Sequence, residues 1–495
     1  MPRTNLPFAT GFYKERTGSN ADLECFNYYP HTPRAPALSE RILRAVPGNN
    51  ARGFIGNSGV SSTFLKMVDS VQIDDRIYVA ATNSFGALTQ LYAVAFQNTT
   101  PSGFTDTLTS GPGSLQVSYK LLHSGSYGSY LDMAASGKHV VVVCSNGSFA
   151  YDIEADTDAQ ITDADFTANG QPNGVCFIDG YFVFTTDERK FIVSAINDPT
   201  SYNALDFGSA EMDPDGCVCP INWRNQLFIA GTKTIESFNN IGGTDFPFER
   251  TGQFFEYGVT TARGVAVHET GVYFDGVGRF SERGFYRMGD DVQQISTTAW
   301  DLMFPNSSTD PQFAFFYSYE DHDFVGFYSD QDAMVYDITE DAWHQRSING
   351  YAFTYARIGD YTLGFGGFQS FSNAVGEIAT DVFTQNGSSV FRRVSLAPVH
   401  SEGMPFSISE IEIVTDNDNA ERFELQISRD GGTTWQDVGA VEYDSPSTDD
   451  RYIFRRLGRV DEDCQLRINV SALPGNPTSS ELPHHIYKIR AEVSA

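Results

Sequence analysis

The stretch Val-Cys-Phe-Ile-Asp-Gly-Tyr-Phe-Val-Phe, residues 175–184, sets two apolar and aromatic runs on either side of an Asp-Gly pair. Asp-Gly between two strand-like runs is a strong local signal for a β-hairpin with a tight turn. A single hairpin cannot bury its apolar face alone and must pack against others. The stretch therefore favours an all-β protein built from packed hairpins.

The same unit of strand, polar turn and strand recurs along most of the chain. After one longer first gap, successive turns lie about 37 to 52 residues apart, which is the period of a β-propeller blade. Radial stacking buries the faces of such sheets and leaves only short edges exposed. We therefore expect a β-propeller of six or seven blades. The other copies of the unit are residues 71–79, 133–143, 218–229, 265–274, 314–327 and 353–365.

Two flanking regions differ from the repeat, so the sequence predicts three parts. Residues 1–55 are rich in Pro and show no alternation, which indicates an extended N-terminal arm. Residues 56–392 hold the propeller, and residues 393–495 hold six short alternating strands that indicate a β-sandwich. Those six strands are expected at residues 406–414, 423–428, 435–441, 452–456, 465–470 and 487–493.

The chain of 495 residues is strongly acidic, with 63 Asp and Glu against 33 Lys and Arg and a net charge of −30. Such a charge argues against gripping nucleic acid, because it repels phosphate. The negative charge is consistent either with simple solubility or with a surface along which DNA passes without binding. The six Cys lie mostly in apolar runs and are expected to be buried free thiols. No apolar leader or spanning segment is seen, so neither signal-peptide export nor a membrane span is expected.

Residues 428–435 match the Asp-box turn pattern in Ser428, Asp430, Gly432 and Trp435. In such a turn the Asp accepts backbone N–H bonds, Gly takes a positive φ, and Trp covers the hairpin. Asp boxes occur in sialidases, yet the box holds no catalytic group. We therefore interpret this single copy as a structural turn.

Four arginines, Arg451, Arg455, Arg456 and Arg459, form the dense basic cluster of the chain. A salt-bridged or interface patch is favoured over DNA contact, and these four are our candidate interface residues.

No catalytic site, cofactor site or metal site is predicted. Cys217 and Cys219 lack the paired spacing and His partners of a zinc site, and the acidic run of residues 152–165 lacks the spacing of a calcium loop. His322-Asp323 and His268-Glu269 fall at expected hairpin turns, where chance adjacency explains them. No nucleophile elbow, zinc-protease helix or phosphate loop is found, so we expect no enzyme.

Several phrases, in the same order along nearly the whole chain, resemble the packaged-DNA-stabilisation proteins of short-tailed phages, also called head-closure or tail-accessory proteins. The first is Cys-Phe-Asn-Tyr-Tyr-Pro at residues 25–30. The most specific lies within residues 205–238 and begins Leu-Asp-Phe-Gly-Ser-Ala-Glu-Met-Asp-Pro-Asp-Gly. The remaining phrases are residues 43–48, 246–250, 271–276, 295–300, 423–432 and 456–459.

The resemblance implies a structural virion protein of the head–tail junction, assembled in the host cytoplasm. It would form a homo-oligomeric ring, expected to be a hexamer, below the portal and adaptor proteins. There it would retain packaged DNA, which passes through without specific binding, and receive the tail needle, tail tip or fibre proteins. The alternative is a carbohydrate-binding or glycan-cleaving propeller such as a tail depolymerase. A secreted bacterial adhesin is disfavoured by the missing signal peptide.

Overall fold

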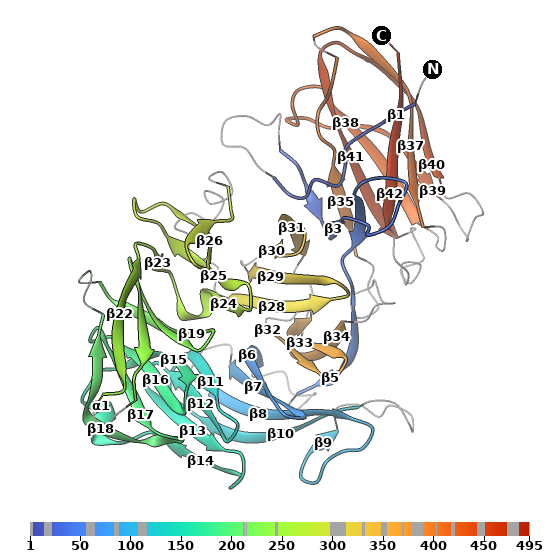
Figure 1. Ribbon diagram of the computed structural model, residues 1–495. Coiled ribbons are helices and arrows are strands. Elements are labelled where there is room, and N and C mark those ends of the chain that lie inside the picture. The colour runs from blue at the N-terminus through green and yellow to red at the C-terminus, as the bar shows by residue number, and fades with distance from the viewer. Residues whose placement is uncertain are drawn as a thin grey trace.

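The computed structural model describes most of the chain as β-strands arranged in a propeller and a sandwich (Figure 1). No helix in the described part of the chain is long and apolar enough to cross a membrane. The described residues are 3–13, 22–55, 65–83, 89–106, 116–210, 213, 215–242, 246–297, 313–328, 332–347, 354–368, 371–378, 390–401, 403–416, 421–442, 451–472 and 485–494.

The propeller has seven blades, which confirms the predicted fold class and fixes the blade number. Blade one contains β6 (Leu65–Ile73), β7 (Arg76–Asn83), β8 (Thr89–Gln97), β9 (Thr105–Asp106) and β10 (Gln116–Gly125). Blade two contains β11 (Tyr130–Ala135), β12 (His139–Cys144), β13 (Gly147–Asp152) and β14 (Thr157–Gln160). Blade three contains β15 (Pro172–Ile178), β16 (Tyr181–Thr186), β17 (Lys190–Ala195) and β18 (Asp198–Ser209).

The remaining blades follow in chain order. Blade four contains β19 (Cys217–Trp223), β20 (Gln226–Gly231), β21 (Ile235–Asn240) and β22 (Phe248–Phe255). Blade five contains β23 (Gly258–Val259), β24 (Val265–His268), β25 (Gly271–Val277), β26 (Arg283–Met288) and β27 (Val292–Gln294). Blade six contains β28 (Phe313–Tyr319), β29 (His322–Tyr328), β30 (Asp332–Asp337) and β31 (Ala342–Ser347). Blade seven contains β32 (Thr354–Ile358), β33 (Tyr361–Phe368), β34 (Phe371–Ile378) and β5 (Asn49–Phe54).

Each predicted hairpin is formed by the first two strands of its blade. Blade five is the exception, because β23 comes first there and the hairpin is formed by β24 and β25. The residues in the hairpin turns explain how the two strands of each hairpin are aligned. Asp179 and Gly180 both take positive φ, at 51° and 91°, as a two-residue hairpin turn with the twist of its strands requires. Arg224 and Asn225 do the same in blade four, at 52° and 59°.

The propeller core consists of separate apolar clusters between neighbouring blades. Blades seven and one share one cluster, and each following pair of neighbours shares another around the ring. The cluster between blades five and six differs, because it continues into the C-terminal sandwich. Burial of apolar surface therefore joins the sandwich to the propeller at this interface, and Tyr29 of the arm adds a contact in the cluster between blades six and seven.

The sandwich joins the last strands of the chain to the first ones. One sheet pairs β37 (Phe406–Thr415), β40 (Arg451–Val460) and β42 (Ile486–Ser494) with three strands of the arm. Those arm strands are β1 (Arg3–Asn5), β3 (Tyr28–His31) and β4 (Ile42–Ala45). The other sheet contains β35 (Arg392–Ser395), β36 (Val399–His400), β38 (Glu421–Ser428), β39 (Gln436–Glu442) and β41 (Asp463–Ala472). All six predicted sandwich strands are present.

The arm is more than an extended segment, because it supplies strands to three sheets. β2 (Cys25–Phe26) pairs in parallel with β31 of blade six and antiparallel with β35 of the sandwich, which makes one continuous ten-stranded sheet. β5, which falls within the residues predicted as the arm, pairs with β34 and completes blade seven. Figure 1 shows the arm descending from the sandwich, where both chain ends lie, past blade six to blade seven.

Candidate functional site

Side chains from several blades meet at the axis of the propeller. The first strands of neighbouring blades contact one another there, and the short 3₁₀ turn η2 (Ala262–Gly264) contacts both β11 and β28. The guanidinium of Arg263 on η2 lies 4.0 Å from the ring centre of Phe313 and 5.8 Å from that of Tyr130. The Tyr130 hydroxyl donates to Asp69 on β6 at 2.6 Å. A chain of contacts thus crosses the axis from blade six to blade one.

Two half-buried carboxylates, those of Asp69 and Asp132, lie at that chain of contacts. Asp132 accepts backbone N–H bonds from Val175 at 2.8 Å and from Met133 at 2.9 Å. Burial, assisted by the nearby Asp69, raises the pKa of Asp132 to about 7. Burial likewise raises the pKa of Asp69 and lowers that of Arg263. Beside Asp132 lies a pocket of about 220 Å³ lined by inner strands of blades two to five. At that volume the pocket is smaller than the roughly 300–1,000 Å³ of a typical ligand site.

The joint between propeller and sandwich is made by the arm residues of the first family-like phrase. Asn27 has a φ of 57°, in the left-handed region that Asn tolerates better than most residues. Its backbone N–H donates to Gln345, and its side-chain oxygen accepts from the backbone N–H of Ser347. Its side-chain amide also donates to the carbonyl of Phe391 at 2.7 Å. One residue thereby ties the arm to blade six and to the segment entering the sandwich.

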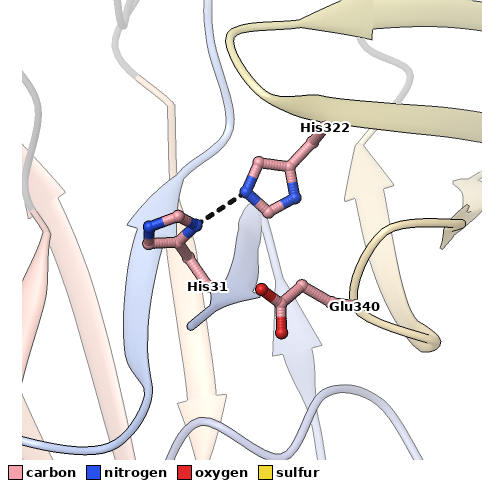
Figure 2. Close-up of side chains that lie close together, drawn as sticks. All are labelled: His31, His322 and Glu340. Atoms are coloured by element: carbon pink, nitrogen blue, oxygen red, sulfur yellow. Dashed lines mark hydrogen bonds between the residues drawn. The ribbon is translucent and has the colours of Figure 1, made fainter. Parts of the chain in front are cut away.

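Next to this joint, two histidines and a glutamate from three separate segments converge. His31 ends β3, His322 begins β29, and Glu340 lies in the turn between β30 and β31. Figure 2 shows the two imidazole rings facing each other, with Nδ1 of His31 and Nε2 of His322 2.8 Å apart, and the Glu340 carboxylate beside them. One potential ligand atom from each lies within 4.8 Å of the others.

The surroundings hold this group in place. Nδ1 of His322 lies 2.7 Å from Oδ2 of the buried Asp337. The Glu340 carboxylate accepts from the backbone N–H and the hydroxyl of Thr32, both at 2.7 Å. Burial lowers the pKa of His31, and the charge of Arg44 lowers it further. Residues 31, 322 and 340 are far apart in the chain, so no local pattern predicts the cluster. The partner of His322 is Asp337, and the sequence neighbour Asp323 instead accepts a hydrogen bond from Ser318.

The predicted Asp-box residues form a compact turn between β38 and β39. Asp430 accepts from the backbone N–H of Thr434 at 2.8 Å, and the Ser428 hydroxyl accepts from the N–H of Gly432 at 2.8 Å. Gly432 has a φ of 86°. The hydrogen bond from the Thr434 hydroxyl, together with those from the Thr434 backbone N–H and the Ser428 hydroxyl, lowers the pKa of Asp430 to about 2. The guanidinium of Arg467 stacks 4.1 Å from the Trp435 ring centre, so Trp435 lies against the neighbouring strand β41.

The predicted basic cluster is distributed along β40 and its members have different partners. Arg451 lies 3.3 Å from the buried Glu412, and Arg455 lies 3.0 Å from Glu410. Arg459 pairs with Asp461 at 3.0 Å, and Arg456 takes a φ of 65° where the strand pairing shifts register. The role of these four residues as an interface stays a prediction.

The six cysteines are buried and none forms a disulfide, as the sequence predicts. Burial raises the pKa of Cys144 and Cys464 to about 11 and that of Cys217 to about 12. Such thiols are poor nucleophiles, because the thiolate is the reactive form.

Comparison with known proteins identifies a family. A family model described as "Phage_stabilise: Bacteriophage P22 Gp10, beta-propeller" matches residues 93–355. No curated protein matches the chain.

Among solved structures, the WD40 β-propeller domain of Doa1 is 12% identical, with a TM-score of 0.41, over 68% of this chain and 97% of that one. CpGH89CBM32-6 from Clostridium perfringens is 18% identical, with a TM-score of 0.15, over 21% of this chain and 70% of that one.

Proposed function

Because the chain belongs to the phage-stabilisation family of Bacteriophage P22 Gp10 propellers, a family of phage structural proteins, we propose that it closes the head–tail junction of a phage particle. In this role it retains packaged DNA below the portal and adaptor proteins and provides the attachment site for distal tail parts. It acts by shape and assembly, without catalysis. The family match carries the proposal, and it also suggests a virion location.

The propeller axis supports a particular arrangement of subunits. Arg263, Tyr130 and Asp69 link blades across the axis, so we expect that duplex DNA does not pass through a single propeller. A channel for the genome must therefore lie between subunits. We propose a closed ring, which requires head-to-tail contacts between neighbouring copies.

Exposed apolar side chains offer a surface for such contacts. Leu205 on β18 is 77% exposed and Ile241 after β21 is 60% exposed, both toward the outer strands of blades three and four. Ile196, in the turn before β18, is 61% exposed. An exposed apolar side chain is stabilised when another protein covers it, so these three are candidates for the contact between copies. Leu205 also begins the most family-like phrase of the sequence.

The charge of the chain fits passage of DNA without retention. A net charge of −30 gives phosphates little to bind, so the genome can leave once the tail opens. Retention would then depend on the shape of the closed ring and on the distal parts that plug it.

The test is a phage that lacks this protein, compared with the same phage complemented by the wild-type chain supplied in trans. We expect the null particles to fill their heads, lose the DNA and carry no distal tail proteins, and we expect complementation to restore both. The measurements are DNA content per particle and the tail proteins that co-sediment with it. Null particles that stay filled and carry complete tails would contradict the proposal.

A further inference from the structure

We propose that His31, His322 and Glu340 form a divalent transition-metal site, best suited to zinc, that clips the N-terminal arm to blade six. Two imidazole nitrogens and a carboxylate oxygen are a ligand set that zinc accepts. They come from β3, the start of β29 and the β30–β31 turn, so one ion would join the arm to two turns of the propeller. This inference does not depend on the proposed function.

The first argument is the direction of the ring nitrogens. Asp337 lies 2.7 Å from Nδ1 of His322, so this nitrogen carries the proton and Nε2 presents a lone pair. That lone pair faces Nδ1 of His31 at 2.8 Å. Without metal, a single proton on His31 bridges the two nitrogens. A metal ion can take the place of this proton once the nitrogens move apart to about 3.3 Å, the separation set by Zn–N bonds of about 2.0–2.1 Å in a tetrahedron.

The second argument is the support behind the ligands. A ligating histidine commonly donates its other ring N–H to a carboxylate, which fixes its orientation and raises its basicity. Asp337 has this position behind His322, and its other oxygen accepts backbone N–H bonds from Thr339 at 2.9 Å and Glu340 at 3.3 Å. The same carboxylate therefore holds both His322 and the turn that carries Glu340.

The third argument is charge. Oδ1 of Asp321 lies 3.5 Å from Nε2 of His322. A small movement of the Asp321 side chain would let this oxygen serve as the fourth ligand of the ion. The carboxylates around the cluster are Glu320, Asp321, Asp337 and Glu340, and they outnumber the three arginines paired with them, Arg34, Arg41 and Arg44, so the surroundings favour a cation. The nearby cation Arg44 is already paired with Glu320 at 2.5 Å and Asp321 at 3.3 Å, and Arg41 lies 3.8 Å from Glu340.

The experiment uses the full-length chain, stripped with a chelator and then titrated with zinc chloride by calorimetry. The metal content of protein purified from zinc-supplemented medium is measured in parallel. We expect about one zinc per chain, lost in His31→Gln and in Glu340→Gln and retained in His268→Gln. His268, at the equivalent hairpin turn of blade five, is the matched control because it lies outside the cluster. Asp337→Asn should weaken zinc binding about 10- to 100-fold, since it orients a ligand without being one.

Substitution with cobalt(II) shows whether the metal is bound by this cluster or by cysteine thiolates. Ligation by His31, His322 and Glu340 gives visible absorption without the sulfur-to-metal charge-transfer band that thiolate ligands add. Circular dichroism of each variant verifies folding, and any variant that fails is replaced by His322→Gln. Sub-stoichiometric zinc in the wild-type chain, a thiolate band with cobalt, or full zinc occupancy in folded His31→Gln would each overturn the proposal.

Discussion

At the residue scale, individual side chains of the arm help to join the propeller to the sandwich. Asn27 adopts a backbone conformation that few other residues tolerate and bonds to residues on both sides of the joint. Its neighbour Tyr29 packs edge-on against His322 and Phe324 of blade six, with ring centres 5.0 Å and 5.2 Å apart. The phrase that resembles the phage family at the N-terminus is thus explained by structure, because it contains the residues that anchor the arm.

Asp132 at the propeller axis gives a testable pH dependence. Burial raises its pKa from 3.8 to about 7, so the folded chain keeps this proton between those pH values, whereas the unfolded chain releases it. The free energy of unfolding therefore falls as pH rises through this window, by up to about 1.4 kcal/mol per pH unit. We expect Asp132→Asn to show a shallower fall between pH 4 and 7 than the wild type.

The measurement is denaturant unfolding at a series of pH values. Asp290→Asn, on the exposed turn between β26 and β27, is the control and should keep the wild-type slope. A slope for Asp132→Asn equal to that of the wild type would show that Asp132 is not protonated in the folded chain.

At the element scale, the hairpins that the sequence reveals are those whose strands are apolar and whose turns carry Asp, Asn or Gly. The pair 175–184 is clear because its strands are buried and its turn is Asp179-Gly180. The outer strands are less clear, since β14 and β22 are largely exposed and lack an apolar pattern. The pairing of β5 with β34 could not be predicted, because the two strands lie at opposite ends of the propeller sequence. The His31–His322–Glu340 cluster was missed for the same reason.

β5 closes the propeller ring, and this closure can be tested. It pairs antiparallel with β34 and adds an ion pair between Arg52 and the buried Glu377. Removal of one partner leaves a buried charge unpaired, so Arg52→Ala should loosen the closure by about 1–3 kcal/mol. We expect faster amide hydrogen exchange in β5 and β34, with β16 of blade three unchanged.

Arg76→Ala is the control for that exchange measurement. Arg76 lies in blade one, away from β5 and β34, where it is 3.9 Å from the exposed Asp75 and 5.3 Å from the ring centre of Phe104. Rapid exchange of β5 in the wild-type chain, as in an unpaired segment, would contradict closure by this strand.

At the scale of the whole molecule, the propeller and the sandwich form one continuous body. A ten-stranded sheet runs from blade six through β2 into the sandwich, and the apolar cluster between blades five and six follows the same path. Force applied to the sandwich is therefore transmitted to the propeller through backbone hydrogen bonds. This connection would suit the proposed role, in which each subunit holds its place in a ring while packed DNA presses on it.

The central claim is that copies of this chain surround the genome channel at the head–tail junction, each with its own propeller axis closed. The most direct test is an electron cryo-microscopy map of the phage particle at a resolution that separates strands. The account predicts seven-bladed propellers arranged in a ring below the portal, with DNA density between subunits and none through any propeller axis. A map with DNA density along a propeller axis, or with no copy of this chain at the junction, would contradict it.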